Sequence, residues 1–138
     1  YGLAHCQILK ISDNEIQWLT GKEDYSAGVA WITSRYQIPL ILVSMGKQGS
    51  RAYYKGSMAE AAPFLRKDTI ETTGAGDTFC GCILHYVAEH GLDGLGTEKL
   101  REMLLFANCA ASLVTTKKGA LRVMPTKDEV EAELGNHA

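Results

Sequence analysis

The sequence predicts an α/β fold with a mainly parallel sheet, and three observations support this. Residues 6–11 read as a short strand that is followed by a helix. A second helical pattern, over residues 24–36, leads into the continuous apolar run at residues 40–43, which is typical of a parallel strand buried on both faces. A glycine turn at residues 74–76 then opens a third helical pattern. Strands that alternate with helices favour a parallel sheet covered by helices.

The composition is that of one globular domain with a core of its own. The 138 residues carry a formal net charge of -2, so no basic patch favours nucleic acid, and no apolar run reaches the length of a transmembrane helix. The four cysteines include no C-x-x-C pair, which favours free thiols in a reducing cytosol over a metal site or a disulfide framework. We therefore expect a cytoplasmic protein with no nucleic-acid or membrane partner.

Helix-boundary signals divide the first third of the chain. Ser12 and Glu15 have the spacing of a capping box, and Gly21 ends the short helix that the box begins. A loop containing glycine, at residues 46–49, joins the buried strand to a further strand at residues 50–55. In the helix over residues 24–36 we expect one stripe to face the core, formed by Ala27, Ala30, Trp31 and Ser34.

The glycine turn is the stretch around which the chain is organised. Gly74, Ala75 and Gly76 let the backbone turn sharply and approach another group closely, and helical spacing follows from Phe79 onward. The unpaired N–H groups at such a helix N-terminus carry roughly half a positive charge and favour an anion, most often phosphate. Asp77, at the mouth of the turn, has two interpretations: a cap or first-turn acid favoured by the dipole, or a general base beside a phosphate.

Two other nucleotide-binding motifs are absent. A dinucleotide-binding fingerprint needs a third glycine where Phe79 stands, and a P-loop needs Ser or Thr after the Gly46-Lys47 pair and a glycine upstream of it.

Residues 71–79, E-T-T-G-A-G-D-T-F, resemble the signature D-T-T-G-A-G-D-x-F of the ribokinase-like sugar kinases, also called the phosphofructokinase-B family. The resemblance implies the C-terminal part of a ribokinase-like fold, a Rossmann-like three-layer sandwich with a mainly parallel sheet. It assigns the catalytic base to Asp77 and the anion hole to Gly74, Ala75 and Gly76. Because family members are considerably longer and this chain begins with Tyr1, we expect residues 1–138 to be the C-terminal nucleotide-binding part, with the N-terminal sugar-binding half absent.

The resemblance gives Glu15 a second interpretation. The family carries N-x-x-E at this place, and its Glu helps to position hydrated Mg²⁺ near the phosphates. Ser12 stands here instead of the Asn, although Glu15 and the following L-T-G keep the spacing. The capping box is a complete structural explanation of the same residue, so both interpretations stay open.

Further residues match the nucleotide site of the family. Ser44, Gly46 and Gly49 correspond to its T-x-G-x-x-G loop, with Ser in place of Thr, and a plain glycine hairpin is the structural alternative. Asn108 lies in F-A-N-x-A-A, where the family contacts the nucleotide near the adenine. The structural alternative for Asn108 is a buried amide that the backbone satisfies.

A monovalent-cation site is also implied, in which a carboxylate and loop carbonyls support the anion hole. Glu71 occupies the place of the family's Asp and is one methylene longer, so we expect K⁺ to stimulate activity weakly or not at all. Lys117 is equally suited to the negative end of the preceding helix dipole. The residues that would form the site are Glu71, Thr73, Val114, Lys117 and Gly119.

The resemblance therefore implies an ATP-dependent sugar kinase that uses Mg²⁺ and, in some members, K⁺. The wording K-I-S-x-x-E-x-x-x-L-T-G at residues 10–21 is most similar to that of bacterial fructokinases. We expect the intact protein to bind ATP and a small sugar and to be a homo-oligomer. The alternative is a non-catalytic chain that binds a nucleotide or a partner without turnover, because the sugar pocket is missing. On either view we expect residues 1–138 alone to be inactive.

Overall fold

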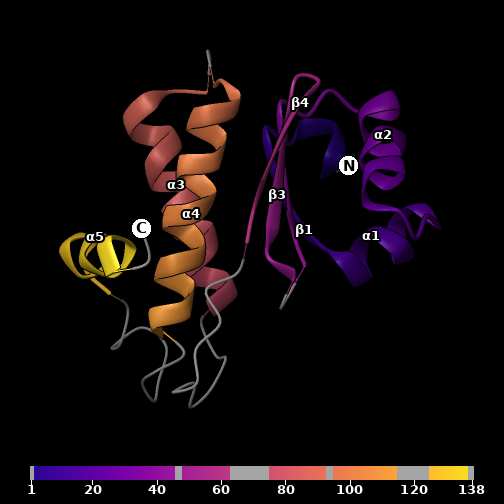
Figure 1. Ribbon diagram of the computed structural model, residues 1–138. Coiled ribbons are helices and arrows are strands. Elements are labelled where there is room, and N and C mark those ends of the chain that lie inside the picture. Colours follow the sequence, from indigo (N-terminus) through magenta and orange to yellow (C-terminus); the bar gives the residue numbers. More distant parts are fainter. Residues whose placement is uncertain (1, 46–47, 63–74, 93–94, 115–124, 137–138) are drawn as a thin grey trace.

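The computed structural model describes residues 2–45, 48–62, 75–92, 95–114 and 125–136. These residues form three layers, with a sheet between two pairs of helices (Figure 1). The strands are β1 (Ile8–Ser12), β2 (Leu40–Ser44), β3 (Ser50–Tyr54) and β4 (Ser57–Ala61). One outer layer contains α1 (Asp13–Thr20) and α2 (Tyr25–Arg35), and the other contains α3 (Ala75–His90) and α4 (Thr97–Val114). A short 3-10 helix, η1 (Leu3–His5), precedes β1, and α5 (Lys127–Asn136) packs on the outside of α4.

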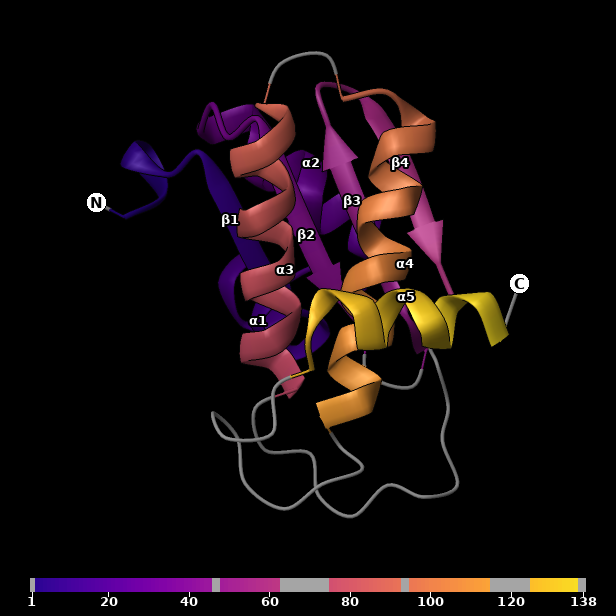
Figure 2. The same ribbon diagram turned by 90° about the vertical axis from the view of Figure 1, so that its left-hand side faces the viewer.

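The sheet is mixed, in the order β1-β2-β3-β4. β1 and β2 are parallel, as expected from the buried strand that follows a helix, with Ile8 opposite Leu40 and Ser12 opposite Ser44. β3 and β4 extend the sheet as an antiparallel meander. The carboxyl ends of β1 and β2 therefore meet at one edge, and in Figure 2 β2 points toward the end of the molecule where α3 begins.

β2 separates two apolar clusters, because its successive side chains point to opposite faces. Leu40 and Leu42 pack with Phe79 and Ile83 of α3 and with residues of α4. Ile41 and Val43 pack with the side chains of α1 and α2. These four residues of β2 are fully buried, which confirms the sequence-based prediction for residues 40–43.

The predicted apolar stripe of α2 is wrong except at Trp31, which packs against the cluster that contains Ile16 and Ile32. Ala27, Ala30 and Ser34 are exposed, and Trp31 is half-buried with the Arg35 guanidinium 4.4 Å above its ring. The buried residues of α2 are Gly28, Val29 and Ile32. The difference arises because α1 packs against the Gly28 side, where a Cβ would collide with the side chain of Ile16. A glycine carries no hydropathy signal, so the pattern of side chains pointed to the wrong face.

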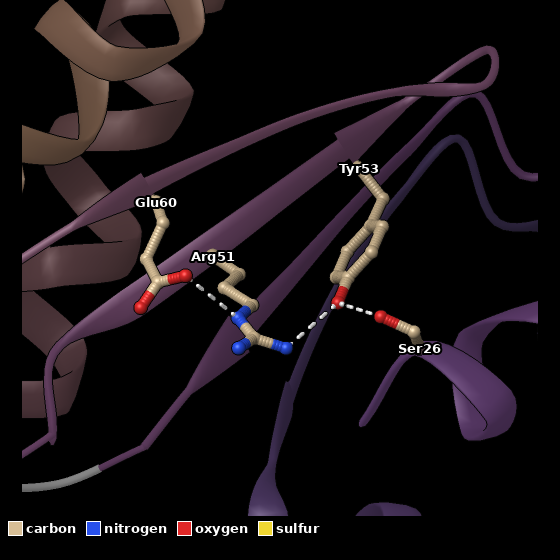
Figure 3. A network of polar contacts seen from close by, with 4 residues as sticks. All are labelled: Ser26, Arg51, Tyr53 and Glu60. Atoms are coloured by element: carbon tan, nitrogen blue, oxygen red, sulfur yellow. Dashed lines mark hydrogen bonds and ion pairs between the residues drawn. The ribbon is translucent and has the colours of Figure 1, made fainter. Parts of the chain in front are cut away.

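The β3–β4 hairpin is tied to α2 by a chain of polar contacts (Figure 3). Arg51 Nε lies 3.2 Å from the Glu60 carboxylate, and Arg51 also donates to the Tyr53 hydroxyl at 3.5 Å. Tyr53 is in turn 3.2 Å from the Ser26 hydroxyl of α2. The hydrogen bond to Tyr53, and less so the charge of Glu60, raises the pKa of Arg51 above its usual value. These groups are at least partly exposed, so the ion pair contributes at most about 1 kcal/mol to stability.

In the part of the chain that the structure describes, no helix combines the length and the apolar character needed to cross a membrane.

Candidate active site

The N-terminus of α3 is the centre of the candidate site. The helix begins at Ala75, so Gly76 and Asp77 lie in its first turn, beside the unpaired N–H groups. Asp77 is exposed, and its carboxylate makes no hydrogen bond or ion pair to any described residue. Its position inside the helix makes it a first-turn acid and not the N-cap residue. Gly74, the third residue of the predicted anion hole, lies outside the described residues.

Gly76 has no steric reason to be glycine within the described structure. Its φ is not positive, and among described atoms only Lys10 Nζ would come within 4 Å of an added Cβ, at 3.8 Å. A glycine in a helix costs roughly 0.5–1 kcal/mol relative to alanine. The residue therefore leaves open space beside the unpaired N–H groups at some cost to the helix.

Glu15 occupies the predicted capping box. Ser12 N donates to Glu15 Oε2 at 2.7 Å, and Glu15 N donates to Ser12 Oγ at 3.3 Å. The hydrogen bond from the Ser12 backbone, with smaller contributions from the Ser12 hydroxyl and the charge of Lys10, holds the pKa of Glu15 below its usual value. The carboxylate is exposed and its second oxygen is free of the capping bond, so it can also accept a hydrogen bond from a metal-bound water.

Lys10 is a site residue that sequence reasoning missed. It belongs to β1, whose Ile8 packs toward α3 and α4 while Leu9 and Ile11 pack toward α1 and α2. Alternation therefore turns Lys10 toward α3, where its ammonium lies beside Gly76. A lone charged residue inside an otherwise apolar strand pattern was the signal that could have found it.

The loop after β2 has a structural explanation. Met45 N donates to Gly49 O at 2.9 Å and Gln48 N donates to Met45 O at 3.0 Å, which closes a tight turn. Gly49 has a φ of 98°, which only glycine adopts without strain. Ser44 is half-buried at the end of β2, and Gly46 lies outside the described residues. The hairpin interpretation is thus observed, and a contact between this loop and a nucleotide remains a prediction.

Both polar atoms of the Asn108 side-chain amide, in α4, form hydrogen bonds within the protein. Its Oδ1 accepts from Ser50 Oγ at 3.0 Å, and its Nδ2 donates to the Ala62 carbonyl at 3.2 Å. These two bonds join α4 to the start of β3 and to the residue after β4. The amide is thus satisfied, but it is half-buried and bonds one side chain and one backbone carbonyl instead of the backbone alone. A contact with adenine remains a prediction.

The predicted cation site falls almost wholly outside the described residues. Of its members only Val114, the buried last residue of α4, is described, and Glu71, Thr73, Lys117 and Gly119 are not. Within the described ranges no three His, Cys, Asp or Glu side chains gather where they could hold a metal ion. None of the four cysteines forms a disulfide bond in the structure.

A hollow of about 680 Å³ runs along α3 from Asp77 to His90, between α3, α4 and α5. Thr78 and Cys82 line it, and burial raises the pKa of the Cys82 thiol. The Thr78 hydroxyl is buried and has no hydrogen-bond partner among the described residues. The first turn of α3 therefore carries unsatisfied hydrogen-bonding capacity in addition to its unpaired N–H groups.

Known proteins resemble the chain along almost its whole length. It is 35% identical over 128 residues to the probable fructokinase-4 of Arabidopsis thaliana and 35% identical over 135 residues to the fructokinase of Klebsiella pneumoniae. These matches cover 93% and 96% of this chain but only 39% and 42% of the relatives, so the chain spans about two fifths of their length.

Solved structures show the same relationship. The fructokinase of Vibrio cholerae O395, in its fructose-, ADP- and calcium-bound form, matches with a TM-score of 0.78 and 30% identity, over 93% of this chain and 41% of that one. The ribokinase of Arabidopsis thaliana complexed with ribose and ATP matches with a TM-score of 0.79 and 31% identity, over 96% and 42%. Residues 2–127 also match the family described as pfkB family carbohydrate kinase. The fold is therefore ribokinase-like, and the chain belongs to the pfkB family of carbohydrate kinases.

Proposed function

We propose that this chain carries the phosphoryl-transfer part of an ATP-dependent sugar kinase, with fructose as the sugar. The observation that carries the proposal is the first turn of α3, where an exposed carboxylate with no described partner stands beside a glycine and unpaired N–H groups. The relatives named above support the reaction class, since several are fructokinases and one solved relative binds fructose and ADP.

In the proposed reaction Asp77 accepts the proton of a sugar hydroxyl as that oxygen attacks the γ-phosphorus of ATP. The bond between the γ-phosphorus and the bridging oxygen breaks, and ADP leaves. The N–H groups of residues 74–77 stabilise the negative charge on the transferring group. Phosphoryl transfer depends mainly on such positioning and charge stabilisation.

Three further contributions are part of the proposal. Bound Mg²⁺ would neutralise phosphate charge, and Glu15 fits a supporting role because its carboxylate is exposed and ionised beside the carboxyl end of β1. Ser44, Gly46, Gly49 and Asn108 would border the nucleotide. Glu71, Thr73, Val114, Lys117 and Gly119 would bind a monovalent cation, with weak K⁺ dependence.

The experiment is a coupled assay of ADP release by the intact protein with a panel of sugars, comparing Asp77→Asn with the unaltered protein. Loss of a positioned general base lowers kcat by roughly a hundredfold to ten-thousandfold, while ATP affinity stays nearly unchanged. Asp128→Asn is the matched control, because Asp128 is also a first-turn acid, in α5. Turnover of Asp77→Asn within threefold of the unaltered protein would show that Asp77 serves only the helix dipole.

A second candidate is a non-catalytic protein that binds a nucleotide or a partner. ATP binding without sugar-dependent release of ADP would select it.

A further inference from the structure

Lys10 holds an unusual position for a lysine. It lies in the middle of β1, opposite the fully buried Leu42 of β2, and is itself half-buried. Its Nζ is 3.8 Å from the point that a Cβ on Gly76 would occupy, so the ammonium lies against the first turn of α3. Figure 2 shows why the two can meet, because α3 lies across β1 and β2 in the view from the α3–α4 side.

A cation is unfavourable at this place in the free protein. The N-terminus of a helix is its positive end, and a cation there is repelled where an anion would be attracted. Half-burial also removes part of the water that would hydrate the ammonium. In the described part of the structure Lys10 makes no hydrogen bond and no ion pair that would offset these costs.

Glu15 does not account for Lys10. The charge of Lys10 contributes to the lowered pKa of Glu15, but it is the smallest of the causes, and no ion pair joins the two side chains. The Glu15 carboxylate is already held by the Ser12 backbone at 2.7 Å. The capping box is therefore complete without Lys10.

We propose that Lys10 is a phosphate-binding residue, whose ammonium contacts the terminal phosphoryl group of ATP as it lies against the first turn of α3. The inference rests on the proposed function and adds to it a residue from a different strand. The anion would then contact two positive groups, the unpaired N–H groups of α3 and the ammonium of Lys10, and Gly76 leaves the space in which it can lie. An ammonium–phosphate contact removes the charge conflict, because the anion lies between two positive groups.

The test compares Lys10→Met with Lys10→Arg in the intact protein, using AMP, ADP and ATP as ligands in calorimetric titrations. Lys10→Met keeps most of the aliphatic stem and removes the charge. Its affinity loss should grow along the series, from less than twofold for AMP to tenfold or more for ATP, because only the longer nucleotides reach the ammonium. Lys10→Arg should recover part of the ATP affinity. Lys22→Met, at an exposed lysine beyond α1, should bind all three as the unaltered protein does.

Thermal unfolding without nucleotide separates this role from a structural one. Because Lys10 is repelled by the dipole in the free protein, Lys10→Met should melt at the same temperature as the unaltered protein or higher, while the rise in Tm on adding ATP becomes smaller. Equal losses for AMP and ATP, or a lower Tm without ligand, would overturn the inference.

Turnover distinguishes the inference from the proposed function on which it rests. If the turnover of Lys10→Met stays within threefold of that of the unaltered protein, the role of Lys10 is refuted and the proposed function still holds. ATP binding that depends on Lys10 in a protein without any sugar kinase activity would support the phosphate contact and refute the proposed function.

Discussion

Gly76 and Asp77 differ from Glu15, Gly49 and Asn108 in that no hydrogen bond or backbone requirement in the described structure explains them. Glu15 closes a capping box, Gly49 supplies a positive φ, and Asn108 bonds two segments of the sheet, so each is explained by the fold alone. For Gly76 the described structure offers no such explanation, and for Asp77 it offers only the favourable position of an acid in the first turn of a helix. A glycine that costs helix stability without a described steric reason is the kind of residue that a ligand accounts for.

A substitution at Gly76 should therefore separate stability from activity. Gly76→Ala adds a methyl group to the space beside the unpaired N–H groups. The nearest described atom to that methyl group would be Lys10 Nζ, at 3.8 Å. We expect the free energy of unfolding to stay the same or to rise by up to about 1 kcal/mol. Turnover should fall roughly tenfold or more, because the phosphate can no longer approach the backbone. Urea unfolding and the ADP-release assay measure the two effects, and unchanged turnover would contradict the prediction.

Gly76 and Asp77 could be identified from the sequence because they belong to the nine-residue pattern at residues 71–79, which is recognised without knowledge of the structure. Lys10 could not be identified in that way. Its role depends on a strand and a helix that are more than sixty residues apart in the chain and lie side by side only in the fold. The sequence shows a charge in an apolar strand, and only the packing shows what that charge faces.

Among the elements, the pair α1 and α2 depends on one small residue. Gly28 of α2 lies so close to α1 that a Cβ would collide with Cγ2 of Ile16, a side chain with 1% of its surface exposed. The boundaries of α1 were predictable, since the capping box of Ser12 and Glu15 and the glycine Gly21 are local signals that the structure confirms. The buried face of α2 was not predictable, because it is set by how closely two helices approach.

Gly28→Ala should destabilise the protein although alanine is the better helix former. Overpacking a filled core costs about 1–3 kcal/mol, whereas the gain in helix propensity is at most about 1 kcal/mol. Gly81→Ala is the matched control, because Gly81 lies within α3 and an added Cβ there meets nothing within 4 Å. Urea unfolding should show a lower midpoint for Gly28→Ala and an equal or higher one for Gly81→Ala. A stabilised Gly28→Ala variant would mean that α1 and α2 can move apart freely.

At the scale of the molecule, β1 is an outer strand of the described sheet. In the described sheet β1 pairs with β2 alone, so the other edge of β1 carries backbone groups without strand partners. Such an edge can accept a strand from another chain. Leu84 of α3 adds an apolar side chain that is 53% exposed.

We expect residues 1–138, expressed alone, to self-associate and to be marginally stable, without kinase activity. Light scattering over a range of concentrations should show masses above that of a 15.0 kDa monomer. A monodisperse monomer that melts cooperatively at micromolar concentration would show that the edge of β1 is harmless.

The change of strand direction at β2 also has a consequence for the order of folding. Two residues link β3 to β4 and five link β2 to β3, whereas residues 13–39 separate β1 from β2. Closing the longer connection costs about 1.5 kcal/mol more in chain entropy than closing the five-residue loop. Local contacts form fastest, so the β2–β3–β4 meander can assemble before β1 pairs with β2. Lys10 is carried by that late strand, so the ammonium reaches the start of α3 only when the sheet is complete.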